Sequence, residues 1–151
     1  MMPAHSKYQT QWAAQFAVAS ELCKHNYKVA LTHGNHPGAD LMVFGPKGTA
    51  FLVEVKGLYK ENYWQVRPWP PKREDPDLFF VFAFVPKDAK NRFFVLTRDQ
   101  CLKEAGAHRR KCQTGRIKKG LPVDDERYRW GVPWRLVAGH ENRWDYLPDW
   151  E

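Results

Sequence analysis

The sequence is poor in cysteine. Its 151 residues include three cysteines, Cys23, Cys101 and Cys112, and no pair of them has the CxxC spacing. An odd number of scattered cysteines indicates neither a disulfide framework nor a structural zinc site. We therefore expect a protein of a reducing compartment.

Long hydrophobic runs and targeting signals are also missing. The apolar run at residues 78–85 falls far short of the roughly 20 residues that cross a bilayer. Residues 1–11 lack the basic and then apolar order of a secretory signal peptide. The sequence thus predicts a cytoplasmic protein that has no membrane partner.

The sequence contains no internal repeat and no second unit, so residues 1–151 are predicted to form one domain. Its core is expected to span about 8–107, followed by a basic loop at 108–120 and a tryptophan-rich segment at 121–151. The formal net charge of +7 favours a polyanion as partner, although such a charge would also serve solubility alone.

The most informative stretch is residues 38–56, which has the pattern of a β-hairpin. Two apolar runs, at 41–44 and 50–56, flank a Gly-Pro-Lys-Gly turn at 45–48. Glycine and proline in this arrangement are typical of a tight connection between two strands.

Three ionisable residues lie at one end of this hairpin. Side chains alternate along a strand, so Glu54 and Lys56 are predicted to point to the same face. Asp40 opens the first strand and lies across the hairpin from them. Two carboxylates beside a lysine suit a divalent metal and a phosphate group.

Asp40, followed after thirteen residues by Glu54-Val55-Lys56, resembles the signature of the PD-(D/E)xK nuclease-like superfamily. That group includes restriction endonucleases and Holliday-junction resolvases. The context also matches, because Asn26-Tyr27-Lys28-Val29 stands where the family usually has Gly-Tyr-x-Val. The resemblance covers roughly residues 8–100.

This resemblance implies a set of site residues and a cofactor. Asp40, Glu54 and the backbone carbonyl of Val55 are implied to bind Mg²⁺ or Mn²⁺, and Lys56 to orient the attacking water. Gln15 stands where the family usually has a glutamate on the first helix. Glutamine can coordinate through its carbonyl oxygen but supplies no charge, so the affinity for the metal should fall.

Together with the resemblance, the order of expected helices and strands predicts the α/β fold class. The expected fold is a restriction endonuclease-like mixed sheet of about five strands flanked by helices. One helix is expected from Ser6 or Thr10 to about residue 25, and another from Gln100 to about residue 107 after a cap at 97–99. Strands are expected at 27–31, 41–44, 50–56, 63–67, 78–85 and 92–96.

The first helix carries an apolar stripe made of Trp12, Phe16, Ala19 and Cys23. Residues spaced by three or four share one side of a helix, and we expect this side to face the sheet.

Several polar and basic residues are candidates for contact with nucleic acid. Lys60, Gln65 and Arg67 flank the predicted site, although a solvated strand face explains them equally well. Residues 108–119 hold six cations and no acid, which favours a loop that contacts phosphates, with a plain solvated loop as the alternative. These cations are Arg109, Arg110, Lys111, Arg116, Lys118 and Lys119.

Four tryptophans mark the C-terminal segment: Trp130, Trp134, Trp144 and Trp150. We expect them to pack on the core, since burying large rings is strongly favourable.

The sequence thus predicts a metal-dependent endonuclease that hydrolyses DNA phosphodiester bonds. A nucleic-acid-binding or interaction module that keeps the fold but cleaves weakly or not at all is the alternative, and Gln15 is its main support. The resemblance also leaves room for a homodimer, because many members of the family cut two strands as dimers. A third possibility is a lone domain that assists a partner protein, such as an enzyme of a restriction or repair complex.

Overall fold

The computed structural model describes residues 6–32, 39–65, 77–123 and 131–151. In chain order the elements are α1 (Lys7–Lys24), β1 (Lys28–Leu31), β2 (Leu41–Phe44), β3 (Ala50–Leu58), β4 (Tyr63–Gln65), β5 (Leu78–Phe84), β6 (Arg92–Thr97), α2 (Arg98–Lys118), β7 (Gly131–Pro133) and the 3-10 helices η1 (Trp134–His140) and η2 (Trp144–Tyr146).

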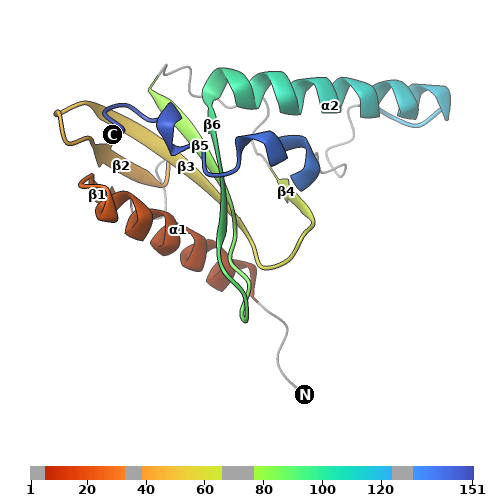
Figure 1. The fold of residues 1–151 in the computed structure, drawn as a ribbon. Coiled ribbons are helices and arrows are strands. Elements are labelled where there is room, and N and C mark those ends of the chain that lie inside the picture. The colour runs from red at the N-terminus through yellow and green to blue at the C-terminus, as the bar shows by residue number, and fades with distance from the viewer. Residues whose placement is uncertain (1–5, 33–38, 66–76, 124–130) are drawn as a thin grey trace.

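Five of the strands form one mixed sheet in the order β1-β2-β3-β5-β6 (Figure 1). The β3–β5 pair is parallel and the other three pairs are antiparallel. The α/β fold with a mixed sheet of five strands and flanking helices is therefore confirmed. The predicted strand at 63–67 does not join this sheet, because β4 pairs with β7 in a separate two-stranded sheet.

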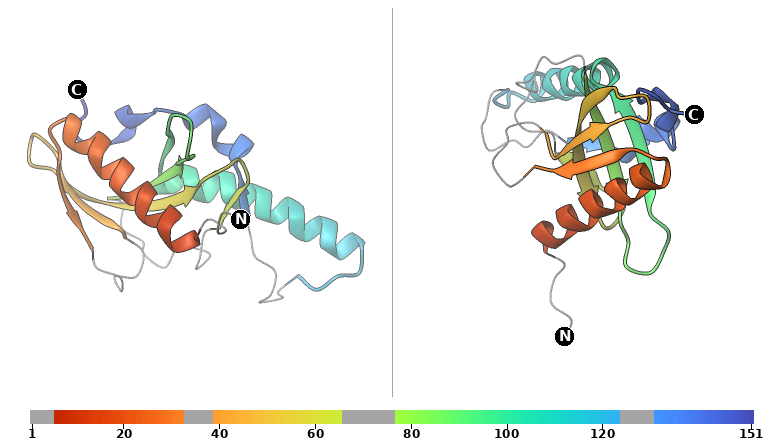
Figure 2. Two further views of the ribbon diagram at one scale, coloured as in Figure 1. Left: turned by 90° about the horizontal axis from the view of Figure 1, so that it is seen from below. Right: turned by 90° about the vertical axis from the view of Figure 1, so that its left-hand side faces the viewer.

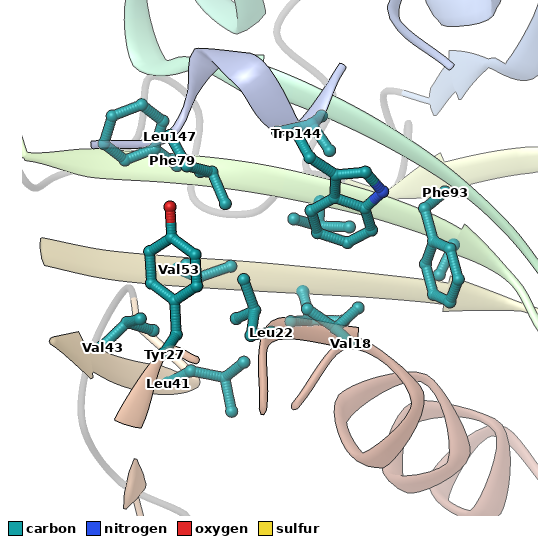
Figure 3. Close-up of a cluster of buried hydrophobic side chains, with 14 of the residues drawn as sticks. Val18, Leu22, Tyr27, Leu41, Val43, Val53, Phe79, Phe93, Trp144 and Leu147 are labelled. Carbon is teal, nitrogen blue, oxygen red and sulfur yellow. The ribbon is translucent and has the colours of Figure 1, made fainter. Parts of the chain in front are cut away.

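The main sheet lies between α1 on one face and α2 on the other (Figures 1 and 2). All seven residues of β5 are buried, as expected for an apolar strand covered on both sides. Phe79 and Val81 join the core on the α1 side, whereas Phe80 and Phe82 join the core on the α2 side. Figure 3 shows the first of these cores, with Val18 of α1 close to the sheet.

The prediction for the buried side of α1 is wrong. The residues that α1 buries are Thr10, Ala14, Gln15, Val18 and Leu22, whereas Phe16 is 55% exposed and Cys23 is exposed. The helix lies so close to the sheet that a Cβ atom on Gly57 of β3 would be 2.5 Å from the Cβ of Ala14. This close approach requires a small side chain at Ala14.

The predicted basic loop at 108–120 is also wrong, because α2 continues through it to Lys118. The helix starts with a capping box, in which Thr97 Oγ1 accepts a hydrogen bond from the Gln100 N–H and Gln100 Oε1 accepts one from the Thr97 N–H. Lysine, arginine, glutamine and alanine are good helix formers, so a polar segment that starts from a strong cap stays helical without a buried side. The C-terminal half of α2 extends past the sheet in Figures 1 and 2.

The C-terminal segment returns to the core, as predicted from its tryptophans. Trp144 is 7% exposed within the core on the α1 side, and Trp150 packs against that core. Trp134 packs against the core on the α2 side, and Trp130 lies outside the described residues. None of the described helices is long and apolar enough to cross a membrane.

Candidate active site

The candidate site forms at the start of β2, where β3 extends beyond its neighbour. Leu41, the first residue of β2, pairs with Val53, so β3 extends beyond its neighbour. The Asp40 N–H still donates to the Val53 carbonyl at 2.9 Å. The Asp40 side chain binds the next backbone group of β3 that points this way: Asp40 Oδ2 accepts a hydrogen bond from the Val55 N–H at 2.7 Å.

Two glutamines of α1 complete this edge. Gln11 Nε2 donates to the Val55 carbonyl at 2.6 Å, and Gln11 Oε1 accepts from the Gly57 N–H at 3.2 Å. Gln15 Nε2 donates to Asp40 Oδ1 at 3.2 Å. The structure therefore places Gln15 beside Asp40, where its predicted role requires it to be.

Glu54 and Lys56 point to one side of β3, as the alternation of side chains predicted. Lys56 Nζ lies 2.7 Å from Glu54 Oε1. The side chain of Glu54 is only 9% exposed, whereas that of Lys56 is 22% exposed. A buried carboxylate needs such a partner, and the ammonium group supplies it while keeping partial access to solvent.

The two carboxyl groups lie in an environment that disfavours their negative charge. Burial raises the pKa of Asp40 above its usual value, while the Val55 N–H and the Lys56 charge oppose that shift. Burial likewise raises the pKa of Glu54, against the attraction of Lys56, and the nearby Asp40 charge adds to the increase. Two carboxylates and one ammonium leave a net negative charge that a divalent cation would balance.

The donor set of the site fits a hard divalent cation. Asp40 and Glu54 offer hard carboxylate oxygens, and Gln15 offers an amide oxygen, which fits Mg²⁺ or Mn²⁺. No group of three or more histidine, cysteine, aspartate and glutamate residues is placed to hold a metal in the described ranges. A metal centre here would accordingly depend on two carboxylates and neutral oxygens.

A hydrogen bond in the structure competes with the implied role of the Val55 carbonyl as a metal ligand. Its carbonyl oxygen already accepts the short hydrogen bond from Gln11, so a metal would have to share this oxygen or displace the amide. Sequence reasoning missed Gln11, although its spacing of four residues from Gln15 places both on one side of α1.

A pocket of about 520 Å³ opens beside Lys56. Of the residues predicted to contact nucleic acid near the site, Lys60 and Gln65 line this pocket together with Lys56, and Arg67 lies outside the described residues. The basic residues predicted at 109–119 do not line it. They lie on α2 or directly after it, and Arg110, Lys111 and Lys118 are exposed there.

Comparisons of the chain with protein-family models, with curated proteins and with solved structures find no match. The nuclease-like resemblance accordingly depends on the motif residues themselves.

Proposed function

We propose that the protein is a metal-dependent endonuclease that hydrolyses phosphodiester bonds of DNA. Two neighbouring contacts on β3 carry this proposal: Gln15 binds Asp40, and Lys56 pairs with Glu54. The Asp40 and Lys56 charges lie close enough for each to act on the neighbouring contact. Gln15 lies on α1, Asp40 directly precedes β2, and Glu54 and Lys56 lie on β3. Buried or half-buried carboxyl groups beside a single ammonium are typical of functional sites.

In this proposal Asp40 and Glu54 hold a Mg²⁺ or Mn²⁺ ion, with Gln15 assisting through its amide oxygen. The ion supplies Lewis acidity to the phosphate and lowers the pKa of a coordinated water. The N–H of Val55 fixes the Asp40 carboxylate, because the hydrogen bond to a rigid strand defines its position. Preorganised ligands of this kind need little rearrangement during the reaction.

Lys56 has the second role. Its ammonium group lies 2.7 Å from Glu54 Oε1 and, with a metal bound, would donate hydrogen bonds to the attacking water and to a phosphate oxygen. Lys56 also lies at the pocket, so a phosphate that enters from solvent reaches it directly. The neighbouring Lys60 adds attraction for the DNA backbone.

A binding module without strong catalysis is the second candidate, and one contact favours it. The Val55 carbonyl and the Gln11 amide form a 2.6 Å hydrogen bond, which competes with coordination of a metal at this oxygen. Gln15 also brings no charge to the site. Under this alternative DNA binding depends on salt and not on a divalent metal.

The deciding experiment compares nicking of supercoiled and branched DNA by the wild type and the Lys56→Met variant, with Mg²⁺ or Mn²⁺. Methionine keeps most of the apolar stem of lysine and removes the ammonium group. We expect cleavage by the wild type and a loss of at least about 100-fold in the variant, in line with the contribution of one positioned charge to catalysis.

Lys47→Met is the matched control, because Lys47 lies at the turn of the same hairpin and its ammonium contacts the exposed Glu151. Thermal melting of each variant separates loss of folding from loss of chemistry. Absence of cleavage by the wild type on all substrates with either metal would favour the binding module. Equal cleavage by wild type and Lys56→Met would refute the role of Lys56.

A further inference from the structure

The exposed side of α1 carries a ladder of aromatic rings. Tyr8, Trp12 and Phe16 follow one another at intervals of four residues, and Tyr8 and Phe16 are 71% and 55% exposed. The Trp12 and Phe16 rings lie 5.4 Å apart and nearly parallel, whereas Tyr8 packs with its edge against Trp12 at 6.1 Å. The rings hold one another in place, so a ligand would meet an ordered surface.

This ladder runs along the candidate active site. Residues three apart on a helix are neighbours on its surface, so Tyr8 lies beside Gln11 and Trp12 beside Gln15. Gln11 and Gln15 are the two residues that reach Val55 and Asp40. The aromatic side chains therefore lie next to the two glutamines that contact this part of the site.

The pocket next to the site has the complementary chemistry. Its described lining includes Lys7, Lys56 and Lys60 and no acidic residue, and Tyr59 and Tyr63 lie in the same wall. Its volume of about 520 Å³ falls within the roughly 300–1,000 Å³ of pockets that hold small organic ligands. The lysines suit phosphates and the tyrosines suit an unstacked base.

We propose that Tyr8, Trp12 and Phe16 and the lysine-lined pocket bind an unpaired strand of nucleic acid beside the cleavage site. The inference deepens the proposed nuclease function, since it names a substrate with a single-stranded segment. Bases in a duplex are already stacked on each other, so exposed rings gain stacking only from unpaired bases. A protein partner would cover the rings but would leave Lys7 and Lys60 of the pocket unexplained.

The test measures binding in EDTA, so that no cleavage is needed. Fluorescence anisotropy follows labelled oligo(dT) of about 15 nucleotides, a duplex of the same length and an oligonucleotide of abasic sites. For Trp12→Ala and for Phe16→Ala we expect oligo(dT) affinity to fall roughly 5- to 150-fold, the measured range for base stacking on one ring. Affinity for the duplex and for the abasic strand should not change.

Two further variants sharpen the result. Trp12→Phe keeps a ring and should retain most of the affinity for oligo(dT). Phe44→Ala is the control, because Phe44 is 43% exposed on β2 and lies away from the ladder, and it should bind like the wild type. Alanine is the best helix former, so the α1 variants should fold, which melting curves can verify.

Unchanged oligo(dT) binding in both alanine variants would overturn the proposal. A change in oligomeric state on sedimentation, with DNA binding intact, would also overturn it and assign the ladder to contact between copies of the chain. Because these measurements need no metal, they are independent of the nuclease proposal. Ring-dependent binding without cleavage would keep this inference and reject the nuclease, and cleavage without ring dependence would do the reverse.

Discussion

Gln15→Glu is the substitution that most directly examines the candidate metal site. In the wild type Gln15 Nε2 donates to Asp40 Oδ1 at 3.2 Å, and the variant replaces this donor by a second carboxylate. Loss of a hydrogen bond to a charged group costs about 1.5–3 kcal/mol. Two negative charges at 3.2 Å repel each other by about 5 kcal/mol at an effective dielectric constant of about 20.

The second figure is an upper limit, because the carboxylates can separate or share a proton. We therefore expect the metal-free variant to be less stable by about 2–5 kcal/mol at pH 8, which lowers the melting temperature of a chain of this size by roughly 5–15 °C. Lowering the pH should reduce the loss, since a shared proton removes the repulsion. Mg²⁺ should reverse it, as saturation at about 100 times Kd adds about 2.7 kcal/mol.

Differential scanning fluorimetry with EDTA and with increasing Mg²⁺ measures both effects, and calorimetry gives the affinity directly. Gln9→Glu is the matched control, because Gln9 is exposed on the same helix and should show neither change. If Gln15→Glu melted like the wild type in EDTA and gained no more from Mg²⁺, Gln15 would not belong to a metal site. Gain of metal affinity without cleavage would show a site that binds the ion but lacks catalysis.

Three further predictions concern packing, pH and salt. Gly57→Ala should destabilise the protein by about 1–3 kcal/mol, because its Cβ would collide with α1. Gly115→Ala has open space around it and should be neutral or stabilising by up to about 1 kcal/mol. Urea unfolding measures the free energy of unfolding of both variants. Because burial raises the pKa of Glu54, the folded state binds a proton more readily than the unfolded chain, so stability without metal should fall as pH rises through the range above about 4.3. Glu54→Gln should remove that share of the pH dependence, and an identical profile in both proteins would contradict it. The double variant Arg110→Ala, Lys111→Ala should reduce the slope of log affinity for duplex DNA against log salt by roughly 2, and an unchanged slope would exclude α2 from phosphate contact.

The hairpin and its motif could be predicted from the sequence because strand geometry is local. Alternation along β3 places Glu54 and Lys56 on one side wherever the strand lies, and their 2.7 Å ion pair follows from that. The buried β5 was equally clear, since an uninterrupted apolar run is suited to a strand covered on both faces. Gln15 was found through the family resemblance, and the hydrogen bond to Asp40 agrees with that position.

The extent of α2 could not be inferred from the absence of apolar residues. That absence predicts only that a segment is not buried, and an exposed helix satisfies the condition as well as a loop does. Helix propensity and the Thr97 capping box decided the outcome, and both are present in the sequence. For this segment, the capping box and helix propensity are better predictors of structure than the lack of apolar residues.

The orientation of α1 was decided by tertiary structure alone. The helix has two apolar stripes, one of Ala14, Val18 and Leu22 and one of Tyr8, Trp12 and Phe16, and the second has the larger side chains. Hydrophobicity favours burying the larger stripe, but α1 packs so close to β3 at Gly57 that only a side chain as small as that of Ala14 fits between them there. The shape of the sheet surface thus selects the smaller stripe for the core and leaves the aromatic rings beside the candidate site, because close packing depends on both partners and a helix sequence describes only one.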